Sequence, residues 1–261
     1  MRQHRAYNFL YHTLTASQWV CGSLGTVVAA SLKADVAKTR SWFAPAADLL
    51  EWAGANAWYL IPVMAVAVGG ASLVKKILGP PWVWNVIHSL LDDLQRRAFG
   101  NDRIGPLHHH RATLFKHVRW RICFRRWPWS GWLIPVERSG HATRRCGVRF
   151  LAPDDADRAE GIAGQTWVCK EVIFVDGLPC LDGKMSNTKC RDYAKKTWVS
   201  EGWLQNERSH ARSFCGIPVE VKGKLWGVIV LDSRDDKPIK QEGDAYYRLI
   251  AKQLGTLLGR G

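Results

Sequence analysis

The stretch that decides the fold is GIPVEVKGKLWGVIVLDS, residues 216–233. Two apolar runs rich in Val and Ile flank the dipeptide Lys222-Gly223. Such runs, separated by a short turn in which glycine supplies a permissive backbone, are typical of a β-hairpin. The segment therefore predicts two paired antiparallel strands. Residues 239–258 follow with a single apolar stripe, which predicts a final helix.

The charge of the chain is concentrated in one region. The formal net charge is +14 over 261 residues, and lysines and arginines crowd residues 111–149, where Glu137 is the only acid. A local basic patch favours contact with the phosphates of lipid or of a ligand over a generally basic protein. Residues 119–129 alternate Arg with Trp, Ile and Phe, as expected of a half-buried strand beside a membrane, so nucleic acid is an unlikely partner.

The cysteines and histidines do not indicate a metal site. The seven cysteines form no C-x-x-C pair, so we expect free thiols in a reducing cytosol and neither a disulfide framework nor a zinc site. Adjacent histidines on a linker point in different directions. We therefore interpret His108–His110, together with His117, as a solvated junction in preference to a metal site.

Residues 1–78 are predicted to be a membrane anchor with two spans, at about 14–32 and 57–76. Each is long enough as a helix to cross the hydrocarbon core, which takes roughly 17–25 residues. The second is the more apolar, and a soluble or interfacial helix remains an alternative for the first. Flanking Arg and Lys residues place both termini in the cytoplasm, and the expected membrane is the bacterial inner membrane.

Residues 79–109 are predicted to form a juxtamembrane amphipathic helix, 82–99, and a linker. Apolar side chains recur in this helix at helical spacing. Asp92 and Asp93 sit badly against anionic headgroups, so we expect the helix to pack on the next domain or to pair with a second copy as a homodimer.

From residue 110 to 261 the pattern becomes α+β. We expect strands at 112–125, 132–138 and 171–175, a short helix at 161–169 and a longer one at 192–204. Together with the hairpin and the final helix, these elements predict an antiparallel sheet with flanking helices, preceded by an all-α membrane hairpin.

Three segments, in this order, resemble the GAF domain family. Glu160–Trp167 looks like the glycine-bearing helix start of the family, Asp176–Pro179 like its short loop, and Ser213–Ser233 like its closing hairpin. The resemblance covers roughly residues 110–260. It implies an antiparallel sheet with helices on one face and a small-molecule pocket on the other, and it leaves the ligand and any cofactor unknown.

Two chemistries of the family lack their residues here. The signature of the cyclic-nucleotide-binding members is missing, because Asn187 is followed by Thr188 and no Asp-Glu dipeptide occurs. In the branch that reduces free methionine sulfoxide, a cysteine stands where this chain has Ala163, and Cys180 and Cys190 lack that partner thiol. We therefore predict no catalytic residues and no enzymatic activity.

The predicted function is a membrane-anchored cytosolic sensor that binds a small molecule and relays the signal through its connector, its spans or a partner. Two alternatives remain: a ligand-triggered membrane effector, and a thiol-based redox sensor or sulfoxide-reductase-like enzyme. The resemblance places the pocket under the loop and helix that cover the sheet, and the predicted ligand-binding residues there combine aromatic walls with polar anchors: Trp167, Phe174, Asp176, Arg191, Tyr193 and Phe214.

Overall fold

The computed structural model describes residues 2–32, 36–100, 110–119, 131–140, 148–181, 187–206, 211–234, 239 and 243–259. The chain divides into two compact units at Val83/Trp84.

The first unit is helical. It contains α1 (Arg2–Ser31), α2 (Val36–Trp42), α3 (Ala44–Ala55) and α4 (Ala57–Leu78). α1 and α4 contact each other along their length, and Gln18 of α1 bonds both Ser72 (2.6 Å) and Lys75 (3.0 Å) of α4. A small apolar cluster lies near the other end of the pair and is formed by Val28, Ala53, Ala57, Leu60 and Met64.

Large apolar side chains remain exposed along α1 and α4. Trp19, Trp58 and Val66 are each about three-quarters exposed or more. Among the described residues, one helical stretch, Ala57–Phe99, is long and apolar enough to cross a membrane. It contains the predicted span 57–76. The predicted span 14–32 does not pass the same test, so an arrangement of two spans is not shown.

The second unit is built on a six-stranded antiparallel sheet with the order β3-β2-β1-β6-β5-β4. The predicted hairpin is confirmed: β5 and β6 pair over their whole lengths, and Lys222 (φ 52°) and Gly223 (φ 74°) form the turn. The strands are β1 (Arg111–Val118), β2 (Trp132–Gly140), β3 (Phe150–Leu151), β4 (Ile173–Val175), β5 (Ser213–Val221) and β6 (Lys224–Ser233).

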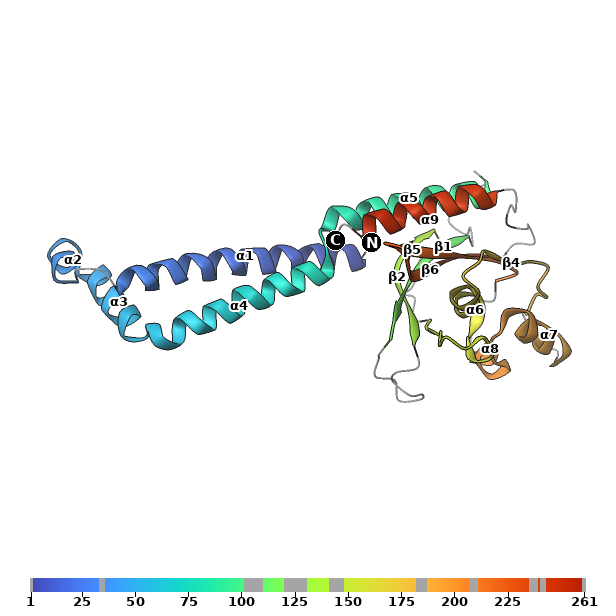
Figure 1. The fold of residues 1–261 in the computed structure, drawn as a ribbon, viewed down its shortest axis with the longest axis horizontal. Helices are drawn as coiled ribbons and strands as arrows, with labels where there is room; N and C mark the ends of the chain where they lie inside the picture. Colours follow the sequence, from blue (N-terminus) through green and yellow to red (C-terminus); the bar gives the residue numbers. More distant parts are fainter. Residues whose placement is uncertain are drawn as a thin grey trace. The chain divides into compact units, whose positions relative to one another are not determined.

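Helices cover both faces of this sheet (Figure 1). One face packs against α5 (Pro81–Phe99) and α9 (Asp244–Leu258), and the other against α6 (Gly161–Cys169), α7 (Asn187–Thr197) and α8 (Glu201–Asn206). A short 3-10 turn, η1 (Ala156–Arg158), precedes α6. The expectation of helices on one face alone is therefore wrong, and a ligand on the second face would lie under α6 and α7.

Three element boundaries differ from those predicted. The strand expected at 112–125 ends at Val118, and residues 120–125 lie outside the described residues. The helix expected at 192–204 is two helices, because Trp198 between them adopts the left-handed conformation (φ 52°). The final helix begins at Asp244 and not at residue 239, after Gly243.

Polar contacts attach α5 to the sheet and to α9. Gln95 donates to the backbone carbonyl of His110 (3.0 Å), and the hydroxyl of Ser139 donates to Asp92 (2.6 Å). The hydroxyl of Tyr246 in α9 donates to Asp93, and the guanidinium of Arg97 lies 4.3 Å from the centre of the same ring. These contacts reach β2, α9 and His110, the residue before β1, so α5 is held against the sheet.

Gly255 determines how closely α9 approaches the sheet. A Cβ atom at this position would lie 1.9 Å from the backbone oxygen of Glu220 in β5. That distance is far below van der Waals contact, and a backbone oxygen in a paired strand cannot move away cheaply.

We therefore predict that Gly255→Ala destabilises the second unit by about 3 kcal/mol through this clash. Gly202→Ala in α8 is the matched control, since its Cβ would meet nothing within 4 Å. It is expected to stabilise the protein by about 0.5–1 kcal/mol, because glycine loses more conformational entropy on folding than alanine. Urea unfolding of the full chain in a mild detergent measures both changes. Equal changes in unfolding free energy in Gly255→Ala and Gly202→Ala would contradict the close approach of α9 to β5.

A second prediction concerns pH. His88 of α5 contacts Glu137 of β2 through Nδ1 and Oε1 at 3.0 Å. This hydrogen bond raises the pKa of His88 above 6.5, against the opposing effect of burial, and the nearby carboxylates of Glu137 and Asp92 act in the same direction. A raised pKa means that the contact contributes its full stability below pH 6.5 and loses it as the pH rises through the folded-state pKa.

His88→Gln is therefore expected to lower the stability of the protein more at pH 5.5 than at pH 8. Glu137→Gln is expected to reduce this pH dependence as well, since it removes the carboxylate that favours the charged imidazole. Chemical unfolding of the three proteins at both pH values measures the difference. A difference in stability between the native protein and His88→Gln that is larger at pH 8 than at pH 5.5 would exclude the proposed pair of His88 and Glu137.

Candidate functional site

The alternation of side chains along the strands defines the face of the sheet under α6 and α7. Phe115 of β1 and Val228 and Val230 of β6 pack in one core cluster with Ala163 of α6. Successive residues of a strand point to opposite faces, so every second residue from these positions lies on the same face. We call this surface the α6 face. Glu137 and Ser139 of β2 lie on the opposite face, where they contact α5.

A polar patch lies on the α6 face where β1 begins and β6 ends. Arg111 donates two hydrogen bonds to Asp232, from Nε at 2.8 Å and from Nη2 at 2.5 Å. The side chains of this pair are 20% and 15% exposed, so the pair is largely removed from solvent. Next to it, Arg138 donates from Nε to the hydroxyl of buried Thr113 at 3.0 Å. The polar patch thus holds two guanidinium groups, one carboxylate and one hydroxyl.

Tyr193 and Phe214 lie at one side of the polar patch. Phe214 is the register partner of Asp232 and packs against the clusters under both α6 and α7. Tyr193 of α7 is buried, and its hydroxyl donates to the carbonyl of Ala211 at 2.7 Å. Burial raises the pKa of Tyr193 well above its usual value, and the nearby Asp232 raises it further. The hydroxyl of Tyr193 is therefore neutral at physiological pH, and the side chain borders the polar patch as a hydrogen-bonding group.

Trp167 of α6 stacks on His117 of β1. The ring centres are 3.8 Å apart and the planes differ by 12°. His117 contacts the carbonyl of Ala152 through Nε2 at 3.1 Å, and burial lowers the pKa of its imidazole. The stack is thus a neutral aromatic pair at neutral pH. His117 lies on the α6 face and is partly buried, and buried His110 contacts Ser233 at 2.8 Å, so the solvated junction is wrong for both. His108 and His109 lie outside the described residues.

α6 lies unusually close to β5 at one position. A Cβ atom on Gly216 would lie 1.9 Å from Oγ1 of Thr166, so only glycine permits this approach. The hydroxyl of Thr166 is buried and has no hydrogen-bond partner among the described residues. An unpaired buried hydroxyl costs free energy, which makes Thr166 a polar group at the edge of the site that a bound molecule or a water would satisfy.

The structure separates the six predicted ligand-binding residues. Trp167, Tyr193 and Phe214 lie on the α6 face. Phe174 is the register partner of Cys215, and its ring faces Tyr247 of α9 with 6.3 Å between the ring centres. It therefore lies on the opposite face.

The remaining two predicted residues are exposed. Asp176 follows β4, and Arg191 of α7 forms a solvent-exposed ion pair with Glu201 at 3.5 Å. Neither reaches into the core clusters under α6 and α7. On this geometry, they belong at most to the rim of the site.

Sequence reasoning missed the whole polar patch. The sequence alone indicates a general basic region around Arg111 and Arg138, and the end of a hairpin at Asp232. The signal that would have found them is strand register, because it places Arg111 opposite Asp232 and Thr113 opposite Arg138. Register between strands separated by more than a hundred residues cannot be read from one sequence.

The thiols of the described residues do not form a reactive group near the polar patch. Cys190 is buried in the apolar cluster under α7, whereas Cys180 is exposed. Cys215 lies on the α9 side, and burial raises the pKa of its thiol, which disfavours the nucleophilic thiolate. Within the described ranges, no three His, Cys, Asp or Glu side chains gather in an arrangement that would hold a metal ion.

Comparison with known proteins identifies a family for the second unit. The family model of the GAF domain matches residues 107–258, more than half of the chain. No curated protein matches the chain.

Several solved structures are similar to the chain. The GAF domain of an Acinetobacter phosphoenolpyruvate-protein phosphotransferase has 13% identity over 67% of this chain and 82% of its own, with a TM-score of 0.41. Residues 122 to 287 of a methyl-accepting chemotaxis protein have 18% identity over 68% and 95%, with a TM-score of 0.41. The type II free methionine-R-sulfoxide reductase from Thermoplasma acidophilum has 11% identity over 68% and 95%, with a TM-score of 0.39.

The hydrogen bond from Tyr193 of α7 to the carbonyl of Ala211 yields a stability prediction. Tyr193→Phe removes the donor to the carbonyl of Ala211 and is expected to cost about 1–2 kcal/mol of unfolding free energy. Arg191→Ala, on the exposed surface of the same helix, is the control and is expected to change stability by less than about 0.5 kcal/mol. Urea unfolding of the full chain in detergent compares the two. A larger loss from Arg191→Ala would show that the rim, and not the buried hydroxyl, holds α7 in place.

Proposed function

The chain belongs to the GAF domain family, and on that premise we propose that it is a membrane-anchored sensor whose ligand binds at the polar patch on the α6 face. GAF domains are typically small-molecule-sensing modules of signalling proteins. The observation on which the proposal rests is the group formed by Arg111, Thr113, Arg138 and Asp232, which is largely withdrawn from solvent and bordered by the aromatic side chains of Tyr193 and Phe214.

The chemistry of the patch favours a small ligand with a carboxylate or a similar anion. Guanidinium groups bind planar oxyanions through paired hydrogen bonds. Arg111 pairs with the carboxylate of Asp232, and Arg138 donates to the hydroxyl of Thr113. In the proposal, Arg111 holds Asp232 in place and Arg138 meets the ligand oxyanion. Asp232 in turn offers an oxygen acceptor to an ammonium or hydroxyl group. A compact zwitterion or hydroxy acid matches this combination of groups.

The signal has a short route from the patch to α5. Arg138 on the α6 face is followed by Ser139, which contacts Asp92 of α5 on the other face. In the same way Arg111 is preceded by His110, whose carbonyl accepts from Gln95 of α5. A ligand that shifts β1 or β2 therefore shifts the residues to which α5 is attached. α5 follows directly on α4, which leads into the apolar helices of the first unit.

The anchoring part of the proposal rests on the first unit. Its helices expose large apolar side chains that an aqueous surface disfavours, and the stretch containing α4 has the length and hydropathy of a membrane span. With α1 as a second span, both termini are proposed to face the cytoplasm. Flanking lysines and arginines favour that side.

We propose a binding role and no catalysis for this site. Ala163 occupies a buried position in the cluster under α6, where a reactive thiol would be needed for sulfoxide reduction. Burial of Cys190 among apolar side chains further disfavours a thiol reaction with a polar substrate.

The test uses the full chain in lipid nanodiscs and a panel of small carboxylates, hydroxy acids and amino acids. Compounds that raise the unfolding temperature are then measured by calorimetry against Arg138→Gln. The variant is expected to weaken binding at least about tenfold, because it removes the charge that pairs with the ligand anion. Arg158→Gln, on the exposed turn η1, is the charge-matched control and is expected to bind normally.

Two outcomes would contradict the proposal. A ligand that binds Arg138→Gln as tightly as the native protein would locate the site elsewhere. A panel in which no compound binds would contradict the proposed ligand class.

A further inference from the structure

A groove lies at the end of the β5–β6 hairpin, away from the polar patch. β4 pairs with β5 only at Phe214–Gly216, so Pro218–Val221 extend past the end of β4. α9 lies along this part of β5, and its Gly255 meets the backbone of Glu220. The space between them is a groove of about 670 Å³, which is open to solvent and reaches from Lys170 at the end of α6 to the last turn of α9.

The groove is strongly basic. Lys170, Lys222, Arg248 and Lys252 line it, and Glu220 is the one acid among its described lining residues. Arg248 is paired with Asp244 at 3.0 Å, but no ion pair of the three lysines is found within the described part of the chain. Cations crowded on one surface without acidic partners repel one another, so an anionic occupant would relieve this repulsion.

Two of these lysines occupy backbone conformations that lysine rarely adopts. Lys170 has φ 58° and Lys222 has φ 52°, in the left-handed region where glycine or asparagine is cheaper. Only one other non-glycine residue of the described ranges, Trp198, shares this conformation. The backbone conformation at both positions therefore disfavours lysine, and a positive charge is the property that lysine adds there.

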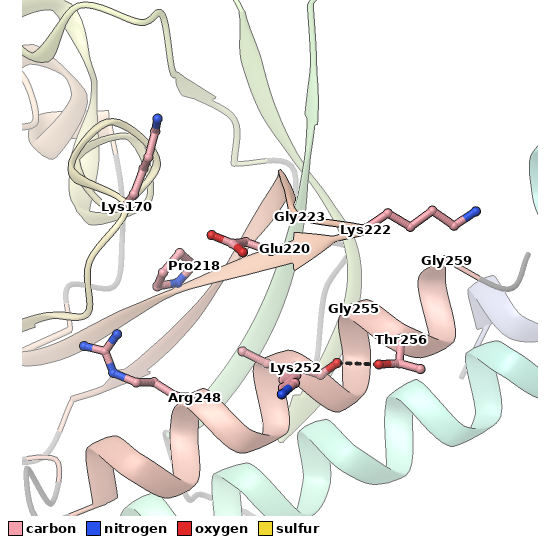
Figure 2. A pocket seen from close by; sticks show the side chains of 11 residues that line it. Lys170, Pro218, Glu220, Lys222, Gly223, Arg248, Lys252, Gly255, Thr256 and Gly259 are labelled. Carbon is pink, nitrogen blue, oxygen red and sulfur yellow. Dashed lines mark hydrogen bonds between the residues drawn. The ribbon is translucent and has the colours of Figure 1, made fainter.

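The shape of the groove selects among anionic occupants. Its charged side chains come from the end of α6, the end of the hairpin and α9, and they do not gather at one point (Figure 2), which disfavours a single compact anion. None of the described residues that line it is aromatic, and they offer no platform on which a nucleobase would stack. Gly223 and Gly259, which have no side chain and are not buried, leave main chain accessible at the groove. An extended chain with regularly spaced carboxylates fits these features.

We propose that this groove docks an acidic, extended peptide segment of a partner protein. The segment would lie along the part of β5 that β4 leaves uncovered, with its carboxylates facing the lysines. Extended peptides commonly bind beside uncovered strands, where the main chain supplies affinity and the flanking side chains supply specificity. The site is separate from the polar patch, so the inference goes beyond the proposed ligand function and would supply the sensor with a route to a cytosolic partner.

The experiment measures fluorescence anisotropy of a labelled peptide of about eight residues that alternates Glu with Thr, since Thr favours the extended conformation. The full chain is held in nanodiscs of zwitterionic lipid. The test variant is Lys170→Asn/Lys222→Asn, because asparagine tolerates the left-handed backbone at both positions. The matched control is Lys189→Gln/Lys195→Gln, which removes the same charge from the exposed surface of α7.

We expect the native protein and the control to bind the peptide alike, and the test variant to bind it about tenfold more weakly or not at all. The binding should weaken with added salt, and a peptide with Gln in place of Glu should not bind. Equal binding by the test variant and the control would overturn the proposal. The proposal would also be overturned if the protein bound anionic lipid vesicles through Lys170 and Lys222 and did not bind the peptide.

Arg138→Gln separates this proposal from the ligand function. The variant alters the polar patch and leaves the groove intact, so it is expected to bind the acidic peptide normally. Loss of peptide binding in Arg138→Gln would contradict a separate docking groove.

Discussion

The pairing of Arg111 with Asp232 is the interaction on which the second unit depends. It joins the first strand of the sheet to the sixth, across more than a hundred residues of sequence, and it does so on the α6 face. The residues next to this pair form a second bond on the opposite face, between His110 and Ser233 at 2.8 Å. One register of two strands therefore places a charged pair on the α6 face, and a hydrogen-bonded histidine and serine on the face that packs against α5.

These two contacts, Arg111–Asp232 on one face and His110–Ser233 on the other, explain why a binding role and a structural role fall on the same strands. A largely buried ion pair costs desolvation, and removal of one partner leaves an unpaired charge, so such pairs contribute less to net stability than to the definition of one arrangement. Here the arrangement that is defined brings two guanidinium groups and a carboxylate together. Because adjacent residues alternate between faces, a change at the patch displaces the residues that hold α5.

The sequence indicated the elements more fully than the contacts between them. The hairpin at 216–233 and the helix at 82–99 followed from alternation and helical spacing, which are local properties, and both are present. The polar patch depends on the register between β1, β2 and β6, which no local pattern specifies. Phe174 shows the same dependence on strand register. The sequence indicates an aromatic residue near the expected pocket, but the pairing of β4 with β5 turns its side chain toward Tyr247 of α9.

The most direct test of the central claim is hydrogen exchange of the full chain in nanodiscs, compared between the native protein and Asp232→Asn. Arg111 and Asp232 lie on the face opposite to the one that packs against α5, yet the paired contacts on the two faces predict faster exchange at 92–99 in the variant, together with faster exchange in β1. Tyr193→Phe serves as a reference for general loss of stability. Unchanged exchange in α5, or a change equal to that in Tyr193→Phe, would contradict the coupling of the two faces.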